Sequence, residues 1–338
     1  MDKKLGKQTV RLKEPVIIRG VASTVGVTEG QGPLGSFFDC VVKDAMFGED
    51  SWEKAESRFV QENMRLAVKK AGCSMQNIDY VLGGDLLNQC TGTTFGVKDF
   101  SIPFFGLFGA CSTMGEAMSL GSMLIDGGYA TNVLVGASSH FCTAEKQFRF
   151  PLPLGIQRTP LASRTVTGDG ALVLSKNGKG PVVREITTGK IVDMGITDVN
   201  NMGAAMAPAA AALIAAHLRD TGRTAEDYDV IVTGDLGEVG RRLAADLLEK
   251  EGFPVDDRYK DCGLLIYDNE KQDAHMGGSG CACSAVTFCS YFYPKLLTGE
   301  IKRMLFVPTG ALLSSISVQQ NLPIPGIAHG IVLECMEQ

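Results

Sequence analysis

The sequence predicts an α/β protein built from two copies of one unit, and three observations support this prediction. Apolar runs of strand length alternate with helical segments, a pattern typical of parallel sheets covered by helices. Four stretches of the first half recur in the second half in the same order. The 40 glycines among 338 residues indicate many tight turns between strands and helices. We therefore expect one α/β unit packed against its own duplicate.

The strand signals are short apolar runs bounded by turn residues. They are YVLGG at 80–84, NVLVGAS at 132–138, ALVLS at 171–175, DVIVTG at 229–234, MLFVPTG at 304–310 and GIVLECM at 330–336. Among the helices, Ser51 is predicted to begin one that stops at Gly72. The alanine-rich run at 204–218 carries Pro208 and is shorter than a bilayer span, so we expect a buried helix.

The duplication rests on four matched stretches. They pair 78–87 with 228–237, 109–114 with 280–285, 132–139 with 305–314, and 167–175 with 327–335. This alignment matches Asp85 with Asp235 and Gly170 with Gly330, and it predicts that the Cys111 and Cys281 helices face each other at the centre. We predict two halves, 1–180 and 181–338, with residues 176–190 as the crossing between them.

The composition excludes several classes of protein. A formal net charge of −6 does not favour nucleic acid or an anionic membrane as a partner. The charged N-terminal residues precede no apolar stretch, so we expect no secretory signal and cytoplasmic synthesis. The ten cysteines are then interpreted as reduced thiols. Cys281, Cys283 and Cys289 suggest metal ligands, but a C-x-C pair on a helix points to opposite faces, and we expect core residues and no metal site.

Cys111 has the clearest chemical meaning. It follows Gly109 and Ala110 and begins an apolar pattern with helical spacing, so we expect it at a helix N-terminus. The unpaired N–H groups there favour a thiolate or another anion. Acyl transfer would also need a base and donors for an oxyanion. Two hypotheses stay open at this point, a catalytic nucleophile and a ligand-binding group.

Several segments carry a resemblance to a known family. The duplicated unit, GACSTM at 109–114, TGDGALVL at 167–174 and GGSGCACSA at 277–285 resemble the thiolase-like superfamily of thiolases and condensing acyl-carrier-protein synthases. More narrowly, GQGPLGSFFD, GDLLNQ, FGACST, AEKQFRFP, KDCGLLIY and TGALLS are similar to the stage V sporulation protein AD family, over essentially the whole chain. The resemblance implies a thiolase-like fold with αβαβα layers, and a homodimer. The apolar strand at 130–139 is the predicted dimer edge.

The resemblance also implies a site that lacks part of its catalytic set. In condensing enzymes the cysteine works with a histidine and an asparagine or second histidine. Here Asp235 follows the strand at 229–234, and an ionised carboxylate neither donates a hydrogen bond nor favours an oxyanion. His275, three residues before Gly278, is either the general base or a loop histidine. We expect Cys111 to mark an ancestral active site that now holds a ligand.

The other histidines admit several interpretations. His140 follows the strand at 132–139 and is predicted either to line the cavity or to lie in a loop. His329 is expected in the core or a turn, and His217 on the surface or in helix packing. The alternative to a binding protein is an acyltransferase with Cys111 as nucleophile and His275 or His140 as base. A third hypothesis is a scaffold for membrane partners with an empty pocket.

The family resemblance implies the ligand and the setting. It implies binding of dipicolinate (pyridine-2,6-dicarboxylate), with calcium as its companion and no other cofactor, for uptake into the developing spore and release in germination. It also implies stage V membrane proteins as partners and a peripheral location at the inner membrane of the forespore.

Several residues are predicted to bind such a dianion. The Cys111 helix, with the Ser112 and Thr113 hydroxyls, is predicted to seat an anion. Guanidinium groups bind carboxylates, and the connection at 145–166 supplies Arg149, Arg158 and Arg164, of which Arg149 is favoured because aromatic residues flank it. Further ligand groups are expected after the first-half strand that ends at Gly84; these are Asp85, Asn88 and Gln89. Asp85 and Asp235 either coordinate calcium or cap helices.

Overall fold

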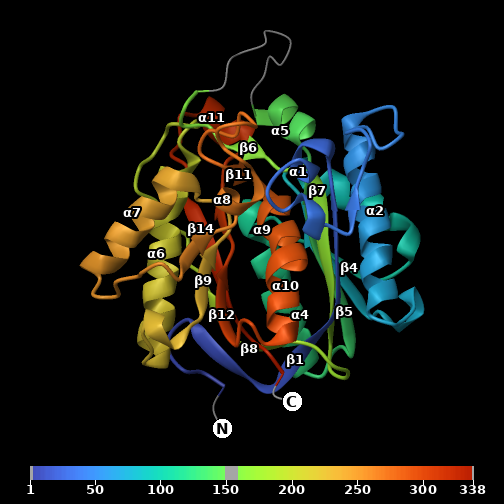
Figure 1. Cartoon of the computed structure of the whole chain (residues 1–338), viewed down its shortest axis with the longest axis horizontal. Helices are drawn as coiled ribbons and strands as arrows, with labels where there is room; N and C mark the ends of the chain where they lie inside the picture. Colours follow the sequence, from blue (N-terminus) through green and yellow to red (C-terminus); the bar gives the residue numbers. More distant parts are fainter. Residues whose placement is uncertain (1–2, 149–158, 337–338) are drawn as a thin grey trace.

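The computed structural model describes residues 3–148 and 159–336 (Figure 1). Within them, twelve strands form one sheet, ten of them in the order β10-β9-β12-β14-β8-β1-β7-β5-β3-β4, and β11 pairs with β6 separately. The strands of the first half are β1 (Thr9–Val25), β2 (Cys40–Val41), β3 (Tyr80–Gly84), β4 (Phe104–Gly106), β5 (Asn132–Ser139), β6 (Arg164–Thr165) and β7 (Gly168–Ser175). Those of the second are β8 (Val182–Thr188), β9 (Val230–Thr233), β10 (Tyr259–Asp261), β11 (Gly278–Ser279), β12 (Arg303–Val307), β13 (Thr309–Ala311) and β14 (Gly326–Glu334).

The strand order is symmetric about its midpoint. From either edge inward, the first half runs β4-β3-β5-β7-β1 and the second half runs β10-β9-β12-β14-β8. The repeated stretches of sequence fall on equivalent pairs in this order: β3 with β9, β5 with β12, and β7 with β14. The predicted boundary at 180/181 lies in the connection between β7 and β8. That connection is shorter than predicted, because β8 already begins at Val182.

The helices form three layers around the strands (Figure 1). They are α1 (Val27–Gly30), α2 (Trp52–Lys70), α3 (Thr91–Val97), α4 (Thr113–Asp126), α5 (Phe141–Phe148), α6 (Met202–Thr221), α7 (Gly237–Lys250), α8 (Gly263–Ile266), α9 (Cys281–Thr287), α10 (Tyr293–Thr298) and α11 (Ser315–Gln319). Helix α2 packs on β1, β5 and β7, while α6 packs on β8 and β14 and against α7. Between the halves, α4 contacts β5 and β14, and α9 contacts β5 and β7. The αβαβα layers are therefore confirmed.

Strand β1 joins the two halves of the sheet. Its first residues pair with β8, with Thr9 opposite Thr187, and its later residues pair with β7, with Val25 opposite Gly168. Both pairings are antiparallel, and a register shift separates Arg11 from Val16. One long strand thus holds the two symmetric units together at the middle of the sheet.

Two of the predicted helices are confirmed. Ser51 is the N-cap of α2, and its side chain accepts a hydrogen bond from the Lys54 N–H. Helix α6 contains the alanine-rich run, with Pro208 inside it. Among the described residues it is the one helix long and apolar enough to cross a membrane, and most of that stretch is buried inside the protein. It packs as a core helix of the second half.

The position of β5 differs from the prediction. The sequence placed this apolar strand at a central edge, but β5 pairs with β7 on one side and β3 on the other. A strand buried on both faces is apolar whether or not it is an edge, so the pattern does not distinguish the two. The edges of the described sheet are β4 and β10.

Candidate functional site

The turn that carries Cys111 is a tight one. A 3-10 turn at Ala110–Ser112 leads into α4, and Ala110 has a positive φ of 48°. The Ser112 hydroxyl donates to the Gly109 carbonyl and the Thr113 hydroxyl to the Ala110 carbonyl, each at 2.7 Å. Both side chains are buried. Their hydroxyls therefore stabilise the turn, and neither side chain is part of the lining of the nearby cavity. Cys111 is partly exposed and lines this cavity.

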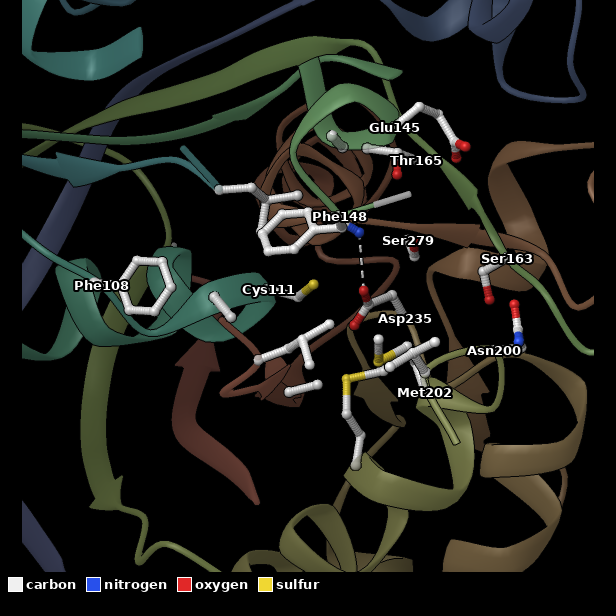
Figure 2. Close-up of a pocket in the computed structure, with 18 residues that line it drawn as sticks. Phe108, Cys111, Glu145, Phe148, Ser163, Thr165, Asn200, Met202, Asp235 and Ser279 are labelled. Atoms are coloured by element: carbon white, nitrogen blue, oxygen red, sulfur yellow. Dashed lines mark hydrogen bonds between the residues drawn. The ribbon is translucent and has the colours of Figure 1, made fainter. Parts of the chain in front are cut away.

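The second half closes the opposite side of this cavity. Asp235 follows β9 and is 1 % exposed. Its Oδ2 accepts a hydrogen bond of 2.9 Å from the backbone N–H of Gly280, the residue that precedes α9. Gly280 has a φ of 97°, a backbone conformation that residues other than glycine rarely adopt. Figure 2 shows the Cys111 sulfur pointing toward the Asp235 carboxyl. The two duplicated units thus meet at a thiol and a carboxyl.

Burial changes the charge state of both groups. Burial, with a smaller contribution from the nearby Asp261 carboxylate, raises the pKa of Asp235 to about 8, although the Cys111 thiol and the Gly280 N–H oppose the shift. Burial also raises the pKa of the Cys111 thiol well above its usual value, with Asp235 and Cys281 adding to the effect. At neutral pH both groups are mostly protonated. The argument that Asp235 cannot donate a hydrogen bond holds only for its ionised form, and the sequence does not reveal the burial that favours the neutral form.

The cavity has a volume of about 110 Å³ and an apolar wall with a few polar groups. Its apolar wall includes Leu86, Phe108, Ala144, Phe148, Val199, Met202, Met206, Ala311 and Leu313, and its polar groups include Cys111, Glu145, Ser163, Thr165, Asn200, Asp235 and Ser279. Figure 2 shows Phe108 and Phe148 apart from Ser163 and Asn200, with Cys111 and Asp235 between them. The cavity therefore has an aromatic side and a polar side.

Asp85 and Asp235 are equivalent in sequence but not in structure. Asp85 is buried, and it accepts hydrogen bonds from the N–H groups of Leu87 and Thr93 and from the Thr93 hydroxyl. Thr93 lies in the first turn of α3, so Asp85 has the capping role. Asp235 has no such role, because Asp261 accepts from the N–H groups at the start of α7. Only Asp235 lines the cavity, so the structure does not bring the predicted calcium pair together.

The predicted histidines lie outside the cavity lining. His140 is fully buried; its Nε2 hydrogen-bonds the Ala45 carbonyl at 2.8 Å and its Nδ1 accepts from the Cys142 N–H. Burial lowers the pKa of His140. Both ring nitrogens are thus bonded to backbone atoms, of Ala45 in a loop and of Cys142 at the start of α5. His275 pairs with Asp273 at 2.8 Å in the segment that bridges to Ser163.

The remaining predicted residues divide into three cases. Asn88 and Gln89 are exposed on the surface and do not line the cavity. Arg164 lies over the Phe141 ring at 4.4 Å, on the strand between two cavity residues but not itself in the lining. Arg149 and Arg158 lie outside the described residues.

The other two histidines, His217 and His329, are both core residues. His217 is buried in α6 and hydrogen-bonds Thr187 and Tyr228 at 2.7 and 2.6 Å. His329 of β14 is also buried, and its Nδ1 has no hydrogen-bond partner among the described residues.

Several lining residues were not found from the sequence. Ser279 lies on β11, one residue before Gly280, in the position where the resemblance implied a second catalytic partner. Glu145, Ser163 and Thr165 come from the connection in which only arginines were considered, and Asn200 from the loop before α6. The pairing of β6 with β11 brings Thr165 opposite Ser279. Attention to that glycine-rich segment would have identified Ser279, whereas no local signal marks the others.

Several solved structures share this architecture. The 3-oxoacyl-[acyl-carrier-protein] synthase III of Aquifex aeolicus aligns with a TM-score of 0.57 at 13 % identity, over 94 % of this chain and 99 % of that one. The priming β-ketosynthase of the R1128 polyketide pathway aligns with a TM-score of 0.59 at 15 % identity, over 96 % and 98 %. At such identities the similarity shows the fold. The duplicated halves and the central cysteine turn place the protein in the thiolase-like class.

The sequence comparisons give the particular family. The family model described as Stage V sporulation protein AD matches residues 6–334. The Stage V sporulation protein AD of Bacillus subtilis (strain 168) is 44 % identical over 329 residues, which is 97 % of each chain. The chain belongs to the stage V sporulation protein AD family, and the predicted resemblance is confirmed.

Proposed function

We propose that this protein binds dipicolinate, together with calcium, in the cavity between Cys111 and Asp235, and that it serves uptake of this ligand into the developing spore without acyl transfer. The observation that carries the proposal is the protonated thiol–carboxyl pair, since a thiol with a raised pKa is a weak nucleophile. None of the described lining residues is a histidine that would act as its base.

The shape and charge of the cavity support this ligand. Phe108, Phe148 and Leu86 form an apolar wall suited to a planar ring, opposite a polar side that can hold carboxylates. The ionisable groups among the described lining residues, Cys111, Glu145 and Asp235, are all acids. A bare dianion gains no positive charge from such a lining, whereas a calcium chelate brings its own. This charge pattern supports calcium as part of the ligand.

A surface beside the cavity supports membrane-protein partners. A groove lined by Val199, Val318, Leu322 and Ile324 shares Val199 with the cavity. Leu322 is 51 % exposed and the adjacent Ile316 of α11 is 66 % exposed. Large exposed apolar side chains often mark interaction sites. We propose that stage V membrane proteins dock here and hold the protein at the inner membrane of the forespore.

The first experiment is calorimetric titration with calcium dipicolinate, with intact-mass analysis after incubation with an acyl-CoA. We expect saturable binding and no mass increase. Cys111→Ala should weaken binding, by up to about tenfold for a lost contact, whereas Cys142→Ala, outside the lining, should not. Arg149→Ala tests the prediction that lies outside the described residues. Absence of binding, with an acyl adduct that disappears in Cys111→Ala, would overturn the proposal in favour of an acyltransferase.

A further inference from the structure

One carboxyl oxygen of Asp235 is buried beside the cavity without a hydrogen-bond partner of good geometry in the described part of the chain. The Oδ2 of Asp235 accepts from the Gly280 N–H, while its Oδ1 is buried without a hydrogen-bond partner of good geometry among the described residues. The Cys111 thiol, a weak donor, also interacts with this carboxyl. The side chain lines the cavity beside Cys111, as Figure 2 shows. Buried polar atoms are almost always paired in native proteins. The open position at Oδ1 therefore points to a partner that enters the cavity.

The groups around Asp235 favour its neutral form. Asp261 of β10 is its nearest fixed negative charge, held by the Thr233 hydroxyl and the N–H groups of Leu236, Gly237 and Gly263. The other ionisable groups facing Asp235 are thiols, and burial raises the pKa of each well above its usual value; they are Cys111, Cys262, Cys281 and Cys283. Glu145 lies farther along the cavity wall. None of these groups supplies a positive charge to keep Asp235 ionised.

The hydrogen bond to Gly280 settles which oxygen holds the proton. A backbone N–H donates to Oδ2, so that oxygen acts as the acceptor of the carboxyl group. This favours the acidic proton on Oδ1, the oxygen without such a donor among the described residues. A protonated carboxyl group is a donor as well as an acceptor, and its O–H bonds strongly to a carboxylate oxygen.

We propose that Asp235 is a specificity residue of the cavity, and that as a neutral acid it donates its Oδ1–H to a carboxylate oxygen of the bound ligand. This inference rests on the proposed function and deepens it. The ligand is then held through a proton that the protein carries, and a ligand without a carboxylate at this position leaves the O–H unpaired. The cavity thereby selects carboxylates although its own ionisable lining groups are acids.

The proposal gives the binding a characteristic pH dependence. Ordinary carboxylates of a ligand are fully ionised above about pH 6 and no longer change. Asp235, with a pKa of about 8, loses its proton above that pH, and the donor becomes a repelling charge. Asp261, whose pKa burial raises to about 6, has titrated before this range. Binding should therefore be about tenfold weaker at pH 9 than at pH 7, because the competent fraction falls by that factor.

The test is titration of the full chain with dipicolinate, as the sodium salt and as the calcium chelate, at pH 6.5, 7, 8 and 9. Whichever of these two forms of dipicolinate binds at pH 6.5 is then titrated at the other three pH values. Asp235→Asn keeps a permanent N–H donor, so we expect it to bind within about threefold of the unchanged protein at pH 7 and to show no pH step. Glu145→Gln is the matched control and should retain the step, because it changes the other carboxyl of the cavity.

The possible results separate this inference from the proposed function. Binding at every pH without a step, or a step that vanishes in Glu145→Gln, would overturn the role of Asp235 and leave the proposed function standing. Loss of binding in a folded Asp235→Asn, or affinity that rises with pH, would show that an ionised carboxylate is required, as for direct calcium coordination, and would also overturn it. No binding of either form at any pH would overturn both proposals.

Discussion

At the scale of single residues, the buried Asp235 carboxyl links stability to pH. The folded protein keeps a proton on this group up to about pH 8, whereas the unfolded chain releases it near pH 4. The folded state therefore binds more protons between these values, and its stability falls as pH rises through the range. The protein thus loses free energy of unfolding at higher pH because it keeps a protonated acid buried beside its cavity.

Asp235→Asn should remove this dependence. An amide has no proton to lose, and its oxygen can still accept from the Gly280 N–H. We expect the variant to gain free energy of unfolding relative to the unchanged protein as pH rises, by about 4 kcal/mol between pH 5 and pH 8.5. Urea unfolding at several pH values measures this. Parallel profiles for the two proteins would show that Asp235 ionises as readily in the folded state as in the unfolded one.

The sequence predicted only part of the site, for reasons visible in individual residues. Cys111 and Asp235 were found because strand ends and a glycine-flanked helix start place side chains at the centre of such folds. The sequence did not show that a tight turn directs the Ser112 and Thr113 hydroxyls to backbone carbonyls. Asp85 follows the same pattern as Asp235 but meets the start of α3. The path of a loop decides such cases, and periodicity does not encode it.

At the scale of elements, the close approach of α9 to β7 depends on a glycine. A Cβ on Gly170 of β7 would lie 2.3 Å from the Ala285 carbonyl carbon in α9. At the equivalent Gly330 of β14, a Cβ would first meet the end of the Leu213 side chain, at 2.8 Å. The backbone of α9 cannot move aside as easily as the end of the flexible Leu213 side chain can. The two glycines match in the repeat but differ in what they touch.

This difference predicts unequal effects of one substitution. Gly170→Ala should lower the free energy of unfolding by about 3 kcal/mol, because it forces α9 away from the sheet, and Gly330→Ala by about 1 kcal/mol. Chemical denaturation of the two variants measures both values. Equal losses would mean that α9 adjusts as easily as the Leu213 side chain.

The positions of the main strands in the sequence were largely predictable, whereas the order of the strands in the sheet was not. Alternating apolar runs identified the main strands, and the repeat identified which ones are equivalent. The edge position of β5 was wrong because strand neighbours are set by contacts between distant segments, which a local apolar pattern does not contain. Short strands such as β6 and β11 have only two residues each and carry no periodic signal.

At the scale of the whole molecule, the β4 edge is where we propose that a second copy pairs. Phe105 of β4 is 48 % exposed, and its ring lies 5.8 Å from that of Tyr80 on β3. Phe95 of the nearby α3 is 56 % exposed. An edge strand with exposed aromatic side chains offers both backbone hydrogen bonds and apolar area to a partner.

Phe105→Glu should convert a dimer into a monomer, because it places a charge at that edge. Light scattering after size exclusion gives the mass directly. Ile316→Glu, at an equally apolar position on α11, is the matched control and should leave the mass unchanged. A monomeric unchanged protein, or a dimer that survives Phe105→Glu, would contradict the proposed interface.

The long first strand has a consequence for how the protein is made. β1 is the first strand to leave the ribosome, yet its partners β7 and β8 begin at residues 168 and 182. Half of the chain must be synthesised before the middle of the sheet can close, and pairings between such distant segments form slowly. We therefore expect the N-terminal segment to wait unpaired during translation and to be the part of the nascent chain that a chaperone protects.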